Sequence, residues 1–562
     1  MAPKQTNIIR FIIIFLILIG FLSLCAIRLI LIHVFHSDHL SSLANKQHNH
    51  FVELEPVRGA ILDRNAHPLA INVSVESLYV NPRMMTSKDK QVALETLPSI
   101  LHIDSKDLQE KLSRNKYFIW LKRKMPAEMS EKIKRLKING LGTIKESKRY
   151  YPNRQLGAHI IGFAGVDNQG LEGVELNYND YLKGEAGQAR ILRDARHQEL
   201  LLQTDFIAPK DGFNVVLTID DTIQFIAEWA LEQGIKKFKA KAGSVIVLDT
   251  RTGEVLALAN WPTYNLDKVE SSSIESRTNR AVSFVYEPGS IFKVITAAAA
   301  LEEGKFTESD KIFCENGKYK VGNHILHDHH PHGTLTFSEV FKVSSNIGVA
   351  KIAQALSADV LYKYIKRFRI GIKTDINVAG EVNGFIRHPS AWSKTSIGAI
   401  PMGHEVTVTP FQMVSAFAAV ANDGVFMRPY VVKEIKDNSG EIIKAYEPTI
   451  VDRVISVETA RRVQEILTGA VEEGTGQNAK IKGVKVAGKT GTAQKVVNGR
   501  YTPGKYYSSF VGFAPADNPR LAAIVVFDEP YPRYFGGTVC APIFKEVIEN
   551  SLKYLTTIGE MN

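Results

Sequence analysis

The strongest constraint on the fold of this chain is an apolar run near its start. Residues 11–27 contain no charged side chain, and the apolar character continues past Arg28 to residue 35. An uncharged stretch of this length is just long enough to cross the hydrocarbon core of a bilayer as a helix. It lacks a convincing small-residue cleavage pattern, which favours a retained anchor over a signal peptide. We therefore predict one transmembrane helix over residues 11–35.

The charges on either side of this run predict its orientation. Lys4 and Arg10 precede it without any acidic residue, whereas residues 36–42 contain Asp38 and neither lysine nor arginine. Cytoplasmic flanks of membrane helices carry an excess of positive charge. Residues 1–10 are therefore expected to form a cytoplasmic tail at the inner (cytoplasmic) membrane, with the rest of the chain periplasmic or otherwise extracytoplasmic.

The exported part is long enough for more than one domain. The chain has 562 residues, of which 44% are hydrophobic and 23% charged, an ordinary balance for a globular protein. Residues 51–206 hold short strand-like runs and no catalytic motif, so they are expected to form a pedestal, and residues 213–562 a catalytic domain. The net charge of +10 is scattered and accompanies no nucleic-acid motif. Anionic cell wall or lipid headgroups are favoured over nucleic acid as its counter-charge.

Three short motifs follow one another in the expected catalytic domain. They are Ser290-x-x-Lys293, Ser344-x-Asn346 and Lys489-Thr490-Gly491-Thr492. The first follows a Pro-Gly turn signal and opens an alanine-rich apolar run over residues 291–301, which has the composition of a buried helix. Each pattern alone is common, whereas all three in this order are typical of an active-site serine enzyme.

The first two motifs can supply a nucleophile and its proton transfers. A serine hydroxyl attacks an acyl group only when a base takes its proton, so Ser290 needs Lys293 in its uncharged form. Burial beside other cations would lower the pKa of that lysine. Ser344 is expected to relay the proton to the leaving amine. Asn346 is expected to hold the substrate amide, because a side-chain amide both donates and accepts.

The third motif ends a short apolar stretch that becomes punctuated by glycine, as in an edge strand beside a site. Lys489, Thr490 and Thr492 are expected to bind a terminal carboxylate. Gly491 is expected to let the substrate backbone approach closely. The backbone N–H groups of Ser290 and Thr492 are the expected oxyanion hole.

Four further segments extend the pattern beyond the motifs. They are RGAILDRN at 58–65, RYYP at 149–152, GLEGVE at 170–175 and GGTVCAPIF at 536–544. Together with the motifs, they make the chain resemble a class B penicillin-binding protein, a monofunctional peptidoglycan D,D-transpeptidase. The branch that it most resembles serves cell division. The resemblance is nearly continuous from about residue 55 to the C-terminus.

This resemblance implies a fold and a set of partners. The implied fold is a mixed α/β transpeptidase domain of the penicillin-binding-protein and serine β-lactamase type, with an N-terminal pedestal that resembles a dimerisation or partner-binding module. Peptidoglycan stem peptides are the implied substrates and β-lactam antibiotics the implied inhibitors. A membrane glycan polymerase and divisome proteins are implied partners, and a dimer is possible. The serine chemistry needs no cofactor.

Two classes of function are open at this point. The first is a transpeptidase that forms an acyl-enzyme with the penultimate D-Ala of a stem peptide and passes the acyl group to an amine on a neighbouring stem, in septal wall synthesis. A D-Ala-D-Ala carboxypeptidase side activity would accompany it. The second is a membrane-anchored β-lactam sensor or scaffold that regulates a glycan polymerase. A β-lactamase is less favoured, because no residue can be assigned to direct water at the acyl-enzyme.

Local patterns predict the main elements of the catalytic domain. They are a strand at 213–220, a helix at 221–238, a hairpin formed by 244–249 and 252–259, and two strands at 508–514 and 521–527. Helical patterns fill much of the middle of the domain. We therefore expect a mixed α/β body with a mostly antiparallel sheet and a helical half.

Cysteines and histidines give no prediction of a metal site. Cys314 and Cys540 could pair only if the fold brings them together, and a free buried thiol is expected at each position. Residues 324–332 crowd five histidines and Asp328 onto one turn with Pro331. Zinc uses such side chains, but no complementary cluster occurs elsewhere in the sequence, so no metal ligands are assigned.

Overall fold

The computed structural model describes residues 4–35, 49–193 and 199–560. The chain forms two compact units, which are described separately. The first holds the N-terminal helix and a three-stranded antiparallel sheet in the order β1-β6-β7. These strands are β1 (Asn49–Leu54), β6 (Gly187–Arg193) and β7 (Glu199–Ile207). The second unit contains residues 58–183 and 212 onward.

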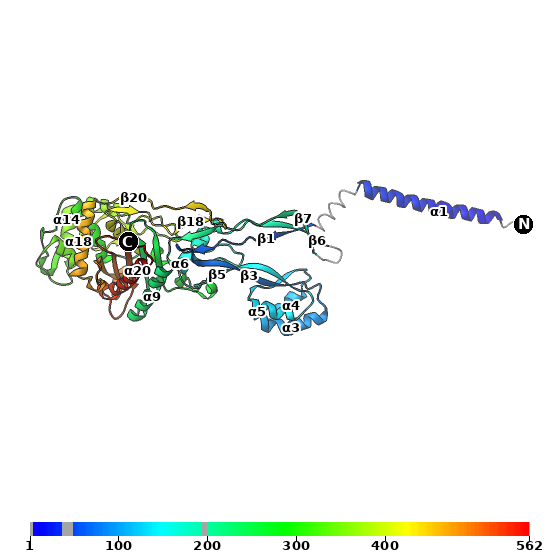
Figure 1. Cartoon of the computed structure of the whole chain (residues 1–562), viewed down its shortest axis with the longest axis horizontal. Helices are drawn as coiled ribbons and strands as arrows, with labels where there is room; N and C mark the ends of the chain where they lie inside the picture. Colours follow the sequence, from blue (N-terminus) through cyan, green and yellow to red (C-terminus); the bar gives the residue numbers. More distant parts are fainter. Residues whose placement is uncertain (1–3, 36–48, 194–198, 561–562) are drawn as a thin grey trace. The chain divides into compact units, whose positions relative to one another are not determined.

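The N-terminal apolar run forms a single long helix. Helix α1 (Lys4–Ile30) continues into a short π-helical turn at Leu31–Phe35 and is drawn in blue in Figure 1. Its segment Ile8–Ile30 has a mean hydropathy of 2.9, and none of it is buried against the described parts of the protein. Length and composition fit a membrane anchor. The anchor predicted from the sequence is therefore supported, although the helix begins earlier than predicted.

A five-stranded antiparallel sheet forms the centre of the second unit. Its order is β10-β9-β23-β22-β21, so β21 is an edge strand. The strands are β9 (Ala242–Asp249), β10 (Val255–Trp261), β21 (Ala487–Val497), β22 (Arg500–Ala514) and β23 (Leu521–Asp528). The predicted hairpin and the two predicted late strands are confirmed, and so is the antiparallel character of the sheet.

Helices cover both faces of this sheet. α9 (Asp221–Phe238) and α20 (Ala541–Thr557) pack against each other on one face, and Figure 1 shows the red α20 beside the green α9. α17 (Pro410–Ala421) packs on the other face against β9, β22 and β23. Helix α9 has the bounds that the sequence predicted. Its N-cap Asp220 accepts hydrogen bonds from two first-turn N–H groups.

Alternation along the central strands separates two hydrophobic cores. Val245 and Val247 of β9 belong to the core beneath α9 and α20, whereas Ile246 and Leu248 belong to the core on the α17 side. Successive strand residues point to opposite faces, so a strand that is covered on both sides is apolar throughout. All eight residues of β9 are buried.

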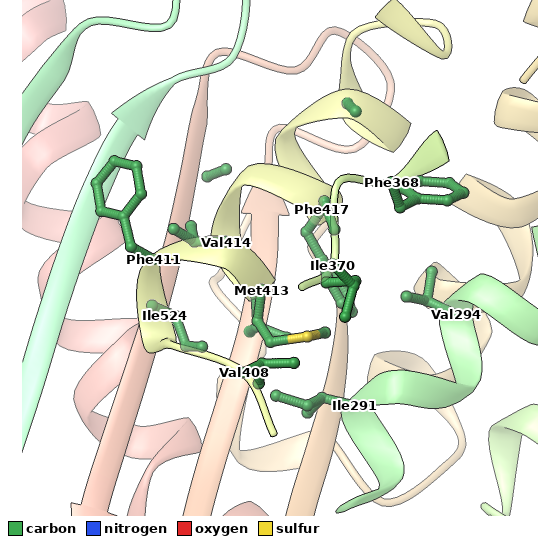
Figure 2. Packing of buried hydrophobic residues seen from close by; sticks show 14 of the residues in the cluster. Ile291, Val294, Phe368, Ile370, Val408, Phe411, Met413, Val414, Phe417 and Ile524 are labelled. Carbon is green, nitrogen blue, oxygen red and sulfur yellow. The ribbon is translucent and has the colours of Figure 1, made fainter. Parts of the chain in front are cut away.

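The helical half of the unit surrounds a fully buried helix. α12 (Lys293–Glu302) begins after a 3-10 turn at Gly289–Phe292, and all of its residues except the last are buried. Figure 2 shows Ile291 and Val294 from this segment in the same core as Met413 of α17. The buried helix predicted after Ser290 is confirmed, with Ser290 itself in the preceding 3-10 turn.

A second sheet combines strands from the N-terminal part of this unit with strands from the catalytic domain. Its order is β19-β18-β8-β2-β3-β4, with β5 paired to β3. The strands are β2 (Ile61–Leu62), β3 (Pro68–Val80), β4 (Ile119–Met125), β5 (Leu141–Tyr150), β8 (Asn214–Leu217), β18 (Val432–Lys436) and β19 (Ile442–Ala445). Short β2 pairs in parallel with β8, the strand that leads into α9. The RGAILDRN segment is thereby hydrogen-bonded to the start of the catalytic domain.

A small helical layer packs on the far end of this sheet. It consists of α3 (Ser87–Leu101), α4 (Ser105–Ser113) and α5 (Ala127–Arg135). Their apolar side chains form a separate core with residues of β3 and β4, among them Leu78 and Leu121. Helix α5 lies within the expected pedestal, and its basic side chains lie in its last turn.

One buried carboxylate joins three of the segments that carried the family resemblance. Glu175 is fully buried and pairs with Arg58 at 2.7 Å and with Arg149 at 2.6 Å. Arg149 also donates to the carbonyl of Gly59 at 2.7 Å. Burial of such charges is tolerated only when they are paired and hydrogen-bonded. The three segments therefore depend on one another through this carboxylate.

We expect Glu175→Gln to destabilise the second unit strongly. The amide keeps the size of the side chain but leaves two buried guanidinium groups without a counter-charge, which costs about 3–5 kcal/mol of unfolding free energy. Urea unfolding of the full chain in detergent would measure the shift. Glu128→Gln is the matched control, because Glu128 and its partner Lys132 are exposed and should not move the midpoint. An unchanged midpoint for Glu175→Gln would contradict the assigned role.

Candidate active site

The structure brings residues of all three motifs to one place. Lys293, at the start of α12, is fully buried. Its Nζ donates to the Ser344 carbonyl at 2.8 Å, to the Asn346 Oδ1 at 2.8 Å and to the Ser344 Oγ at 3.3 Å. Lys489 of the third motif also donates from Nζ to the Ser344 Oγ, at 2.9 Å. The Ser344 hydroxyl therefore lies between two lysine side chains.

Backbone strain and capping fix the position of the second motif. Ser344 has a left-handed φ of 63°, and Ser345 is the N-cap of α14 (Asn346–Leu356). Asp328 accepts from the Ser345 hydroxyl at 2.6 Å and from the Ile347 N–H at 3.0 Å. A carboxylate at a helix N-terminus is favourable because it satisfies free N–H groups there. Asp328 thus holds the turn that presents Ser344 to both lysines.

The environment lowers the pKa of both lysines. Burial is the main reason that the pKa of Lys293 lies well below its ordinary value, and the charge of Lys489 lowers it further, while Asp328 opposes the shift. Burial lowers the pKa of Lys489 to about 7. A lysine of depressed pKa can be uncharged near neutral pH and can then accept a proton. This electrostatic arrangement suits Lys293 to the role of a base.

Ser290 lies at a cavity of about 440 Å³ that Ser344, Asn346, Thr490 and Thr492 also line. Its side chain is half-buried in the 3-10 turn before Lys293. Among the described residues, no hydrogen bond joins Ser290 Oγ to Lys293, whose Nζ bonds to the second motif instead. Catalytic hydrogen bonds are often long in the free enzyme and shorten in the substrate complex. The role of Ser290 as the nucleophile stays a prediction at this point.

The third motif lies on the edge strand β21, as predicted. The hydroxyl of Thr490 is hydrogen-bonded to that of Thr475 at 2.7 Å, and Thr492 Oγ1 accepts from the Gly536 N–H at 3.0 Å. Gly491 has no room for a side chain, because a Cβ there would lie 2.4 Å from Ser509 Oγ. The packing inside the protein thus requires a glycine, and the predicted approach of substrate to its backbone is untested.

The turn that carries Ser290 packs against the third motif. Gly289 has a positive φ of 58°, and a Cβ at this position would lie 3.3 Å from the Thr492 carbonyl oxygen. The backbones at Ser290 and Thr492 are therefore near neighbours. This proximity supports the predicted oxyanion hole, which needs two N–H groups that point to one spot.

Further cavity residues were not assigned from the sequence. They are His329, His330, Met402, His404, Thr475, Asn478 and Phe535. His329 packs edge-on against Phe535, with ring centroids 5.0 Å apart. Phe535 directly precedes the GGTVCAPIF segment, and His329 and His330 belong to the histidine cluster at 324–332. The sequence therefore pointed to the neighbourhood of these three residues. His404 had no such signal.

Other members of the cluster at 324–332 have a structural role in this fold. His324 and His327 lie at the ends of strand β13 (His324–His327), which pairs with β12 (Lys318–Val321), while Asp328 caps α14. Cys314 and Cys540 are buried, free thiols in two different hydrophobic cores. The expected free thiols are confirmed.

Comparison with known proteins identifies the class. Residues 243–549 match the penicillin-binding protein transpeptidase domain, and residues 53–217 match the penicillin-binding protein dimerisation domain. The chain therefore belongs to the penicillin-binding proteins. Its activity class is that of a serine-type peptidoglycan D,D-transpeptidase, and the class B assignment made from the sequence is confirmed.

Several relatives are similar over most of their length. The stage V sporulation protein D of Bacillus subtilis is 36% identical over 92% of this chain and 81% of its own. The probable peptidoglycan D,D-transpeptidase PenA of Neisseria meningitidis is 35% identical over 89% and 85%. The peptidoglycan D,D-transpeptidase FtsI of Escherichia coli is 33% identical over 90% and 86%. Among solved structures, penicillin-binding protein 3 of Mycobacterium tuberculosis with aztreonam has a TM-score of 0.69 at 27% identity, over 90% of this chain and 97% of the other.

The two depressed pKa values predict a bell-shaped pH dependence of acylation. The second-order rate constant should rise with pH as Lys293 loses its proton. It should fall above about pH 7, because Lys489 then becomes neutral and attracts a substrate carboxylate less strongly. Stopped-flow measurement with a chromogenic penicillin over pH 5–10 would test this. A rate that keeps rising to pH 10 would show that Lys489 stays charged in the free enzyme.

Thr490→Val should weaken recognition of a substrate carboxylate. The change removes one hydroxyl at nearly constant volume and should cost about 1.5–3 kcal/mol in the acylation barrier, the usual value of a hydrogen bond to a charged group. The loss should largely vanish for an analogue whose carboxylate is esterified. Rates for acid and ester on both proteins form a double-mutant cycle. Equal losses would mean that Thr490 serves the strand through its bond to Thr475.

Proposed function

We propose that this protein cross-links peptidoglycan stem peptides through an acyl-enzyme on Ser290. The observation that carries the proposal is the buried Lys293, which lies within hydrogen-bonding distance of Ser344 and Asn346 and has a depressed pKa. Burial of a lysine without a carboxylate partner is costly. A chemical role for the uncharged amine explains why such a side chain is placed there.

Acylation is the first half of the reaction. Neutral Lys293 takes the proton of Ser290 as Oγ attacks the carbonyl of the penultimate D-Ala, and the N–H groups of Ser290 and Thr492 stabilise the oxyanion. The Ser344 hydroxyl, which contacts both lysines, passes the proton to the departing D-Ala amine. Asn346 holds the substrate amide.

The third motif binds the end of the substrate. Lys489, Thr490 and Thr492 hold the terminal carboxylate, which stem peptides share with β-lactam antibiotics. Capture of a β-lactam by Ser290 leaves an acyl-enzyme that reacts slowly, which explains inhibition. The acyl group of a natural substrate passes to an amine of a neighbouring stem.

The proposed arrangement in the membrane follows from the anchor. Residues 1–10 are cytoplasmic, residues 11–35 cross the membrane, residues 51–206 form the pedestal and residues 213–562 the extracytoplasmic transpeptidase domain. The flanking charges of the anchor support this orientation. The match of residues 53–217 to a dimerisation domain supports a role of the pedestal in contacts with divisome proteins, a glycan polymerase or a second copy.

A role in septal wall synthesis accounts for the similarity to FtsI over most of both chains. The sporulation relative is similar to the same extent, so the chemistry is common to both and the cellular role depends on partners. Depletion of the protein in its own host, followed by microscopy, tests this role. Filaments without septa are expected, whereas round or swollen cells would assign it to side-wall growth.

Ser290 should carry the covalent adduct of a penicillin. Oγ adds to the β-lactam carbonyl and opens the ring, so the intact mass should increase by that of one whole penicillin molecule. Peptide mapping should place the adduct on Ser290, and Ser290→Ala should not react. Lys293→Arg should also fail to react, because arginine stays protonated and cannot act as the base. An adduct on Ser344 would overturn the assignment.

The Ser290→Ala variant also tests, in cells, the alternative that the protein is a sensor or scaffold. If the protein acts mainly as a sensor or scaffold, cells whose only copy is Ser290→Ala should grow normally. We expect them to fail, because the acyl-enzyme is required. Immunoblotting would verify that the variant is present at the normal level.

A further inference from the structure

A carboxylate, an imidazole and a phenol form a cluster at the wall of the active-site cavity. Glu287 Oε2 lies 2.9 Å from His404 Nδ1, and the Tyr501 hydroxyl donates to Glu287 Oε2 at 3.0 Å. His404 lines the same cavity as Ser290. The three residues come from distant parts of the chain, and none belongs to the three motifs. The acylation steps described above do not use any of them.

Hydrogen bonding determines which nitrogen of His404 is available. Nδ1 lies 2.9 Å from Glu287 Oε2 and 3.2 Å from the Tyr501 hydroxyl. A carboxylate only accepts hydrogen bonds and the hydroxyl donates to Glu287, so Nδ1 carries a proton. The neutral imidazole then has an unprotonated Nε2, which can accept a proton. No hydrogen bond to Nε2 occurs within the described part of the chain. Tyr501 remains a donor to Glu287, because burial and the nearby Glu287 charge raise the pKa of its phenol.

The backbone holds His404 close to the nucleophile. The Gly289 N–H donates to the Gly403 carbonyl at 3.2 Å, and these glycines directly precede Ser290 and His404. Gly403 has a φ of 83°, and a Cβ there would lie 2.2 Å from the Gly289 oxygen. Such close contact leaves little freedom. The backbones that precede Ser290 and His404 are therefore held together, and both residues line the same cavity.

The carboxylate of Glu287 has no arginine or lysine partner among the described residues. Glu405 donates its backbone N–H to Glu287 at 2.9 Å, but its own carboxylate pairs with Arg387 and Ser396. Among the described residues, His404 is the only ion-pair partner of Glu287. A neutral His404 leaves the charge of Glu287 available to attract a cation from the cavity.

The second half-reaction needs such a group. An acceptor amine has a pKa near that of lysine, about 10.4, so at neutral pH it arrives as an ammonium ion, which has no lone pair with which to attack. Lys293 and Ser344 return one proton to Ser290 Oγ as the acyl bond breaks, so the additional proton of the ammonium ion needs another acceptor. On the basis of the proposed transpeptidation, we propose that Glu287 and His404 form the subsite for the acceptor ammonium and that His404 Nε2 removes its extra proton.

The proposed step balances as follows for atoms and charge. The ammonium gives one proton to His404 Nε2 and becomes a neutral amine. The amine nitrogen attacks the acyl carbon, the bond from that carbon to Ser290 Oγ breaks, and a second proton travels from the amine nitrogen through Ser344 and Lys293 to Oγ. The products are an amide, free Ser290 and a protonated His404, which returns its proton to water.

The experiment separates this role from acylation. A thioester of the donor peptide forms the acyl-enzyme, which then partitions between water and added D-alanine. At pH 7, His404→Gln should lower the ratio of aminolysis to hydrolysis by about a hundredfold, the lower end of the usual range for general-base catalysis. The rate of acylation by benzylpenicillin should stay within about twofold. His388→Gln, whose side chain does not line the cavity, is the matched control and should behave as the wild type.

Two further measurements exclude a merely structural effect. Hydroxylamine is uncharged at pH 7 and needs no base, so His404→Gln should react with it as fast as the wild type. Glu287→Gln should raise the D-alanine concentration needed for half-maximal aminolysis, because the charge that attracts the ammonium is lost.

Equal losses with D-alanine and hydroxylamine, or an unchanged ratio, would overturn the inference. Loss of penicillin acylation in His404→Gln would also overturn it, because the histidine would then act on the Ser290 turn. Failure of the wild type to react with penicillin would instead refute the proposed function.

Discussion

The active site depends on a lysine that the fold keeps away from water. Lys293 stands at the start of a helix whose other side chains are almost all buried and apolar, so α12 can pack only if this amine is accommodated. No carboxylate hydrogen-bonds to it within the described part of the chain. Its partners are a carbonyl, an amide and a hydroxyl, which accept hydrogen bonds from a neutral amine as well as from a charged one. Burial without a carboxylate partner therefore favours the uncharged form that the chemistry needs.

The two-sided sheet explains how distant motifs meet around this lysine. α12 and α14 lie in the helical half, while Lys489 and Thr490 lie on an edge strand whose open side faces the cavity. An edge strand can offer its backbone to an extended substrate, which central strands cannot do because their backbone groups are already paired. The buried carboxylate of Glu175 has a comparable role outside the cavity, since it joins three segments of the N-terminal part of the same unit.

Patterns in the sequence predicted the elements that local chemistry determines. The bounds of α9 were right because Asp220 caps it, and the strands around residues 244–259 were right because both of their faces are buried. The cluster of Glu287, His404 and Tyr501 was missed because its members are far apart in sequence and become neighbours only in the tertiary fold. No metal ligands were assigned among the residues at 324–332, and the role of Asp328 in that cluster as the cap of α14 was not predicted, because it depends on tertiary contacts.

The close approach of two lysines also links substrate binding to base strength. In the free enzyme, burial lowers the pKa of Lys489 to about 7, so this residue carries only part of a charge at neutral pH. A substrate carboxylate beside it favours the protonated form. Both lysines contact the Ser344 hydroxyl, and the positive charge of Lys489 lowers the pKa of Lys293 by electrostatic repulsion. The charge of the group that recognises the carboxylate is therefore coupled to the pKa of the base.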